Sequence, residues 1–196
     1  MTKELSRGYK DSTFRELFNN EDAARELVNA IEGTDYGDDT KVEINNLEGS
    51  IFTDLQNDVS FTLDDKLYFF LEHQSTINPN MPYRMLRYYA ECMANMYGNR
   101  NFFGVRRKEI LTPEFYVVYN GKEDIGEGYV LKLSDMFADK RPAFLDLIVK
   151  VIDIRYDESK EIFEKSSTLK QYSKFVDLVE KLTAERGRSS ETTAEI

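Results

Sequence analysis

Two acidic residues and one amide in the middle of the chain form the arrangement best suited to chemistry. Asp58, Glu72 and Gln74 lie within a short stretch, and the last two close the strongly apolar run LYFFL. Two carboxylates beside an amide favour a hard divalent ion such as Mg²⁺, which prefers oxygen ligands and keeps several waters. Such an ion lowers the pKa of a bound water, so the chemistry that these residues could support is metal-assisted activation of water.

These residues come together only if the surrounding segments pair as a hairpin. Val59 to Leu63 and Leu67 to Gln74 read as antiparallel strands, separated by the polar turn Asp64-Asp65-Lys66. With a three-residue turn, Asp58 faces Glu72 with the Cβ atoms roughly 5 Å apart. Two carboxylates this close repel each other without a partner, so we expect a cation between them.

The register leaves alternatives open. Gln74 follows Glu72 by two residues and projects from the same face of the strand. A two-residue turn would instead pair Asp58 with Leu71 and send the carboxylates to opposite faces. Asp54 is a second candidate for the first acid if the register shifts. Acids at strand ends are also often simply solvated.

Four strings of the sequence carry a resemblance that bears on this choice. NDVSF, LEHQSTINPNMPYRMLRYY, TPEFYVVYNG and LKLSDMF resemble the recombination-promoting nuclease (Rpn) / putative transposase family, a branch of the PD-(D/E)xK nuclease superfamily. The likeness runs from about Tyr9 through LKQYSKFVDLVEK. It implies an α/β restriction-endonuclease-like domain over residues 1–186, with a mixed sheet flanked by helices. It further implies a metal-dependent DNA endonuclease that uses Mg²⁺ or Mn²⁺ in recombination or in mobile elements.

The resemblance also assigns roles by position. Asp58 matches the first acid of the motif and Glu72 the second, so both are expected to be catalytic metal ligands. The backbone carbonyl of His73 is expected to face the metal, with its side chain on the opposite face, in the core or behind the site. Gln74, also expected to be catalytic, stands where the superfamily has lysine. An amide can orient water but carries no positive charge and cannot act as a base, so activity could be weak.

Two arginines follow the Glu72 strand. Pro82 suits the first turn of a helix that ends near Gly98, and Arg84 and Arg87 lie in its first turns. Both are candidate phosphate ligands, and Arg84 matches an arginine of the family pattern. The alternative is a surface arginine paired with an acid such as Glu91.

A basic stretch follows that helix. NRNFFGVRRK places Arg106, Arg107 and Lys108 beside two phenylalanines, and this combination offers charge and stacking surface to a nucleic-acid strand. A solvated loop before a buried strand explains the composition almost as well.

The N-terminal part predicts helix. A 3.6-residue apolar period follows Ser12, breaks near Asn19-Asn20 and stops at Gly33. The resemblance marks Lys10 and Asp11, just before this helix, as characteristic, so we expect them to support the site. An exposed turn is the alternative.

The second half of the chain predicts a mixed sheet. EFYVVYNG indicates a central strand, and its position after a helix indicates a crossover connection. YVLKLSDMF and AFLDLIVKVIDIRY predict two further extended segments, and Leu169 to Arg186 predicts a helix. Residues 187–196 lack apolar content and are expected to be disordered.

Composition narrows the class of protein. The 196 residues suit one domain, and 13 Phe and 12 Tyr supply a sizeable core. A net charge of −10 argues against nonspecific coating of nucleic acid, so contact with DNA must be local. The single Cys92 excludes an intramolecular disulfide. Neither a signal-type segment nor a long apolar run is present, so we expect a cytoplasmic protein without membrane contact, with a homodimer left open.

Two other functions share these features. A DNA-binding or protein-binding module could retain the fold without useful catalysis, and Gln74 and the acidic net charge favour it somewhat. A nuclease acting on RNA would use the same residues.

Overall fold

A single six-stranded mixed sheet organises the chain. The computed structural model describes residues 9–45, 58–98, 102–139 and 141–194, with side chains up to residue 185, so the alternative acid Asp54 lies outside the described residues. The strand order is β1-β2-β3-β4-β6-β5. The strands are β1 (Val42–Ile44), β2 (Val59–Leu63), β3 (Leu67–Gln74), β4 (Thr112–Tyr119), β5 (Val130–Lys132) and β6 (Ile148–Asp153).

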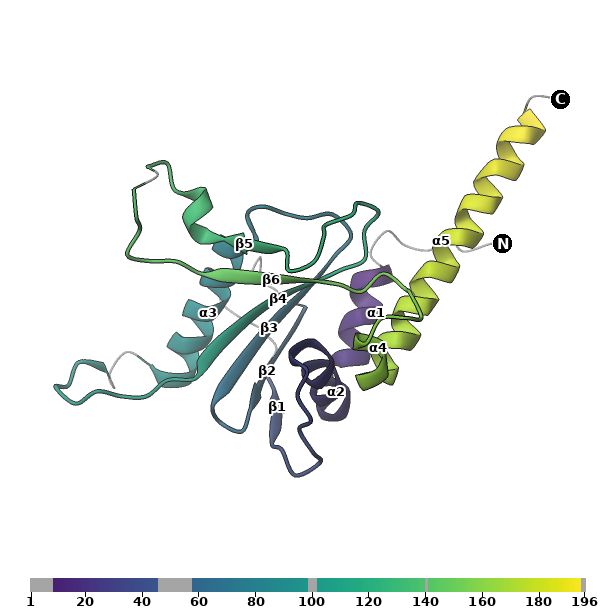
Figure 1. The fold of residues 1–196 in the computed structure, drawn as a ribbon. Helices are drawn as coiled ribbons and strands as arrows, with labels where there is room; N and C mark the ends of the chain where they lie inside the picture. Colours follow the sequence, from purple (N-terminus) through teal and green to yellow (C-terminus); the bar gives the residue numbers. More distant parts are fainter. Residues whose placement is uncertain (1–8, 46–57, 99–101, 140, 195–196) are drawn as a thin grey trace.

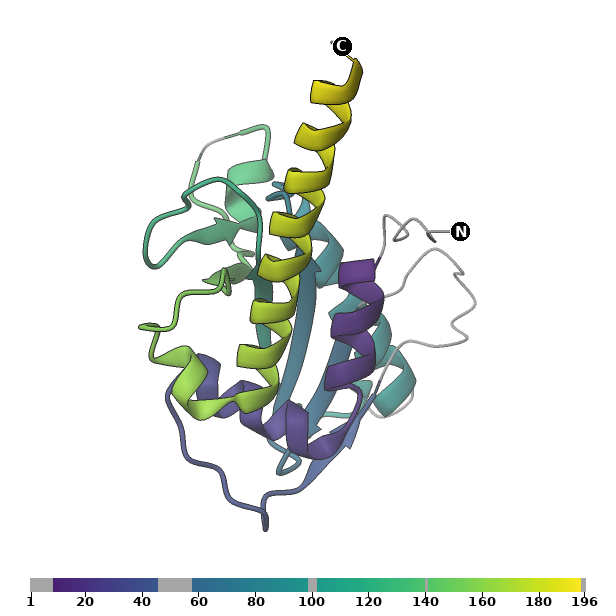
Figure 2. The same cartoon turned by 90° about the vertical axis from the view of Figure 1, so that its right-hand side faces the viewer.

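Helices cover both faces of this sheet, which confirms the predicted α/β restriction-endonuclease-like class. They are α1 (Tyr9–Phe18), α2 (Glu21–Glu32), α3 (Met81–Tyr97), the 3₁₀ helix η2 (Leu133–Met136), α4 (Ile162–Lys165) and α5 (Ser167–Ala194). Helices α1, α2, α4 and α5 lie on one side and α3 on the other (Figures 1 and 2). Strands β3, β4 and β6 are parallel, so their carboxyl ends meet at one edge of the sheet.

The central strand β3 is buried on both faces. Phe69 and Leu71 pack into the core under α1, α2 and α5, whereas Tyr68 and Phe70 pack into the core under α3. This double burial explains why the strand reads as a continuous apolar run instead of an alternating one. The same alternation sends Glu72 toward α3 and His73 toward α1.

The β2–β3 hairpin has the register predicted from a three-residue turn. Val59 pairs with Leu71 and Leu63 with Leu67, so continuing the ladder by one residue places Asp58 opposite Glu72. The first two turn residues have φ angles of 52° and 53°, a left-handed conformation that aspartate adopts more readily than most residues.

Local signals predicted most helix boundaries in the first half of the chain, but α1 begins at Tyr9, so Lys10 and Asp11 lie inside the helix and not before it. The predicted break is present, because Asn20 caps α2 by accepting the Ala23 N–H at 2.9 Å. Gly33 ends α2 in the left-handed conformation, with φ of 70°. Pro82 lies in the first turn of α3, as expected.

Two expectations in the second half were wrong. Residues 133–136 form the 3₁₀ helix η2 instead of continuing the strand, because the Asp146 carboxylate binds both the backbone N–H and the hydroxyl of Ser134 at 2.9 Å. Helix α5 continues to Ala194, past the expected end at Arg186. Each added residue in a helix gains one backbone hydrogen bond, so elongation needs no apolar face. No helix in the described ranges is long and apolar enough to cross a membrane.

We predict that Gly121→Ala destabilises the edge that carries the site. A methyl group on Gly121 would overlap the backbone oxygen of Ser75, which directly follows β3, and the ring of Tyr119. The overlap should lower the free energy of unfolding by about 1–3 kcal/mol in urea titrations. Gly104→Ala is the control, because open space surrounds that glycine. Equal stability of the two variants would contradict the close approach of the two strand ends.

Candidate active site

The two carboxylates meet at the carboxyl end of β3. Glu72 is 4% exposed, and the Asp58 side chain is 14% exposed. Asp58 lies just before β2, and its Oδ2 accepts the backbone N–H of His73 at 2.7 Å. This hydrogen bond ties the first acid to the strand that carries the second, so the hairpin register and the hydrogen bond together set the carboxylate pair.

Arginines from two helices approach this pair. On α3, Arg84 donates from one terminal nitrogen to Glu72 Oε2 at 3.2 Å and to the Tyr88 hydroxyl at 2.7 Å. On α1, a terminal nitrogen of Arg15 lies 4.0 Å from Asp58 Oδ1. The sequence predicted a cation between the carboxylates, but Arg84 was expected to bind phosphate or to pair with an acid such as Glu91.

Sequence reasoning missed Arg15 and Tyr88. Both stand four residues after a residue that was singled out, Asp11 in the first case and Arg84 in the second. Residues four apart lie on the same face of a helix, so this spacing was the available signal. It could not say which helix faces would dock on the hairpin.

Burial controls the charge of the acidic pair. Desolvation, reinforced by the negative charge of Asp58, raises the pKa of Glu72 to about 8, and the neighbouring Arg84 only partly offsets this. Burial likewise raises the pKa of Asp58, in spite of its hydrogen bond from the His73 backbone. Glu72 Oε1 is buried and accepts no hydrogen bond from the described residues. The site therefore holds a carboxyl group whose ionised form needs a further positive partner.

A divalent ion fits this requirement. An ion bound to Glu72 and Asp58 would supply the partner that Oε1 lacks and would favour the charged carboxylates. Within the described ranges, no three or more His, Cys, Asp or Glu side chains gather as a ligand set. The protein would therefore contribute two carboxylates, with a backbone carbonyl and waters completing the shell. Such a set suits Mg²⁺ or Mn²⁺ and does not suit zinc, which takes four N or S ligands in structural sites.

His73 is held from both sides. Its ring lies on the face opposite Glu72, as predicted, with the side chain fully buried and Nδ1 2.7 Å from Asp11 Oδ1. The rings of Phe14 and Tyr172 pack around it with centroids 5.6 and 5.7 Å away. This hydrogen bond lowers the pKa of Asp11. Because the His73 backbone N–H also binds Asp58, the contact with Asp11 helps to position the peptide group that joins Glu72 to His73. That the His73 carbonyl faces a metal stays a prediction.

Lys10 ties the same edge to α5. Its Nζ lies 2.6 Å from Glu180 Oε1 and 3.3 Å from the Ser75 hydroxyl. Ser75 follows Gln74 directly, so Lys10 approaches the end of β3 from the face of the sheet that α1 covers. The supporting residues predicted from the sequence thus contact the strand segment that follows Glu72.

The remaining predicted residues divide into near and distant groups. Gln74 Oε1 accepts the backbone N–H of Asn78 at 3.1 Å, so the oxygen of this amide is already bound to the loop that follows β3. Arg87 is exposed on α3. The exposed residues Arg106–Lys108 follow the far end of α3, so the structure does not bring them to the carboxylates.

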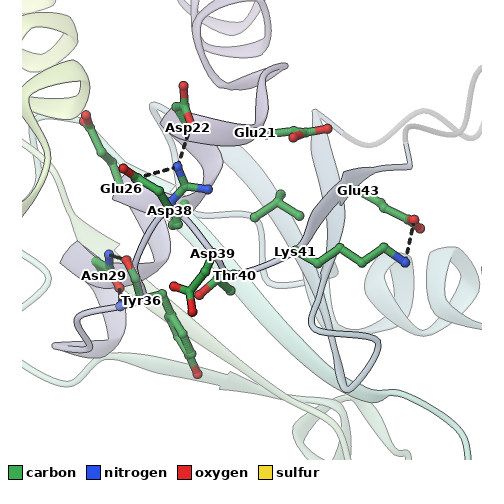
Figure 3. A pocket seen from close by; sticks show the side chains of 12 residues that line it. Glu21, Asp22, Glu26, Asn29, Tyr36, Asp38, Asp39, Thr40, Lys41 and Glu43 are labelled. Atoms are coloured by element: carbon green, nitrogen blue, oxygen red, sulfur yellow. Dashed lines mark hydrogen bonds and ion pairs between the residues drawn. The ribbon is translucent and has the colours of Figure 1, made fainter.

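A pocket lies between α2 and β1 and contains none of the predicted site residues. It has a volume of about 760 Å³, and acidic side chains of residues 21–43 dominate its lining (Figure 3). Arg25 is already paired there, with Asp22 at 2.5 Å and Asp38 at 3.1 Å. The negative charge of this pocket is unfavourable for a phosphate, so the Asp58–Glu72 pair remains the candidate site.

The comparisons with known proteins cover the whole site. A family model described as "Putative transposase, YhgA-like" matches residues 9–176, a range that contains every predicted site residue. The comparisons with curated proteins and with solved structures gave no match.

We predict that Glu72→Gln stabilises the metal-free protein at alkaline pH. The pKa of Glu72 rises from 4.5 to about 8 on folding, so the stability it contributes in the neutral form is lost as pH rises through that window. The free energy of unfolding of Glu72→Gln in EDTA should exceed that of wild type by about 2–4 kcal/mol at pH 8.5 and match it near pH 4.5. Glu109→Gln, at an exposed position, should follow wild type at both pH values. A difference that shrinks as pH rises would refute the buried-acid description.

Proposed function

This chain belongs to the family described as "Putative transposase, YhgA-like", part of the Rpn/PD-(D/E)xK-like group, and we propose that it is a metal-dependent DNA endonuclease serving recombination or mobile elements. The observation that carries the proposal is the buried Glu72 carboxyl, which lies opposite Asp58 and has one oxygen without a partner among the described residues. A buried acid with a raised pKa beside a second acid is typical of a functional site.

Each residue near the pair has a role in this proposal. Asp58 and Glu72 would hold Mg²⁺ or Mn²⁺, and the His73 carbonyl would add a third protein ligand. The bound ion lowers the pKa of a water ligand and neutralises charge on the scissile phosphate. Gln74 orients the water through its amide nitrogen, which fits the use of its oxygen by Asn78.

Arg84 changes partners in this proposal. Without metal, its guanidinium lies against Glu72, with the side chain 38% exposed. With a cation bound at Glu72, the guanidinium would be available to a phosphate oxygen, for which its planar donors are well suited. Arg84 would thereby supply part of the positive charge that Gln74 cannot provide.

A binding module without useful catalysis is the second candidate. The Arg84–Glu72 ion pair supports it, because the arginine already provides Glu72 with a counter-charge. The absence of a lysine at position 74 supports it as well. Such a module would bind DNA equally well with and without EDTA and would not cut it.

We predict that Asp58→Asn and Glu72→Gln each abolish cleavage. Loss of one ligand charge should reduce nicking of supercoiled plasmid in Mn²⁺ by at least about 100-fold, because the ion supplies the nucleophile. Asp65→Asn is the matched control, since this acid is exposed in the hairpin turn and pairs with Lys41. Wild-type nicking by either site variant would rule out catalysis at this pair.

We further predict that Mn²⁺ affinity rises with pH. The raised pKa of Glu72, about 8, means that binding must displace a proton at neutral pH. The affinity measured by calorimetry should increase by about tenfold per unit between pH 6 and 7.5, and level off above 8. Buffers of different ionisation enthalpy should report the release of about one proton at pH 7. An affinity that is constant over this range would exclude Glu72 as a ligand.

A further inference from the structure

An apolar groove lies at the far end of α3 from the carboxylate pair. The C-terminal half of the helix and the following segment enclose a volume of about 400 Å³, within the roughly 300–1,000 Å³ of pockets that bind organic ligands. Aromatic and long apolar side chains line it. They include Tyr89, Met93, Tyr97, Phe102, Phe103 and Ile110.

The walls of the groove are fixed by the core. Tyr89 packs edge-on against Phe70 and Phe115. Tyr97 packs edge-on against Phe102 at a centroid distance of 5.6 Å. Its hydroxyl accepts the backbone N–H of Leu111, the residue just before β4, at 3.2 Å. Phe103, by contrast, is 87% exposed. The groove therefore presents a large aromatic surface to solvent beside a rigid wall.

Unpaired positive charge borders this aromatic surface. Arg106, Arg107 and Lys108 are all exposed, and none forms an ion pair with a described residue. Glu109 is the single acid between residues 102 and 111. In a chain with a net charge of −10, such a cluster is the local feature that attracts a polyanion.

We propose that the groove stacks unpaired bases of a nucleic-acid strand whose phosphates follow Arg106–Lys108. Base stacking on aromatic side chains combined with a basic track is the usual basis of single-strand binding. A blunt duplex would use the cations but would leave the aromatic groove empty. The inference rests on the proposed endonuclease function and specifies its substrate, DNA that carries a single-stranded segment.

Helix α3 connects the groove to the site. From Arg84 to Tyr97 the helix rises by about 20 Å, a distance that a few nucleotides of a single strand can span. Arg87 and Ala94, which lines the groove, are seven residues apart and so lie on the same face. Arg87 is exposed and has no ion pair with a described residue. A strand leaving the groove would pass this cation on its way to Arg84.

Binding in EDTA tests the groove independently of cleavage. Fluorescence anisotropy would compare a labelled dT12 strand with a blunt 12-base-pair duplex. Wild type should bind the strand at least tenfold more tightly, and Phe103→Ala should weaken that binding by about 5- to 150-fold, the loss of one stacked base. Val105→Ala is the control, because Val105 is fully exposed in the same segment and does not line the groove.

Two binding results would overturn the inference. One is equal affinity of wild type and Phe103→Ala for dT12, and the other is equal affinity of wild type for strand and duplex. If wild type binds dT12 through Phe103 but cuts nothing in Mn²⁺, the groove stands and the endonuclease proposal fails. If Phe103→Ala cuts tailed DNA as wild type does, the endonuclease stands and the groove fails.

Discussion

The burial of the Glu72 carboxyl is the constraint on which the site depends. Strand β3 is covered on both faces, so its one acidic side chain, Glu72, points into the protein instead of into solvent. A buried carboxylate is costly unless charge and hydrogen bonds compensate, and Asp58 adds repulsion instead of relief. Arg84 on α3, and in our proposal a divalent ion, supply positive charge that offsets the cost of burying the Glu72 carboxylate.

The scaffold around Glu72 fixes geometry from both faces of the sheet. On one face, Asp11 holds the His73 ring, and the His73 backbone holds Asp58. On the other face, Tyr88 anchors the Arg84 guanidinium against Glu72. The peptide at His73 thus transmits the position of α1 to the acidic pair. Such support from packed helices and strands is what keeps a catalytic group within a fraction of an ångström of its working position.

Local sequence predicted the hairpin that pairs the two acids but not the helix contacts around them. Turn length sets the pairing of a hairpin, and the three polar residues after Leu63 predicted the observed register, although a two-residue turn remained an alternative from the sequence alone. The Arg15 contact was not predictable, because it depends on how α1 docks on the hairpin. The actual partner of Arg84 was missed for the same reason, and the length of α5 because backbone hydrogen bonding continues a helix without an apolar signal.

The most direct test is to measure the pKa of Glu72 itself. The ¹³C NMR signal of its side-chain carboxyl would be titrated with and without Mg²⁺, and Glu72→Gln would assign the signal. We predict a pKa of about 8 for Glu72 in EDTA and a fall of at least about two units at saturating Mg²⁺, since a bound cation favours the charged form. An ordinary pKa near 4.5 in EDTA, or a raised value that Mg²⁺ leaves unchanged, would contradict it.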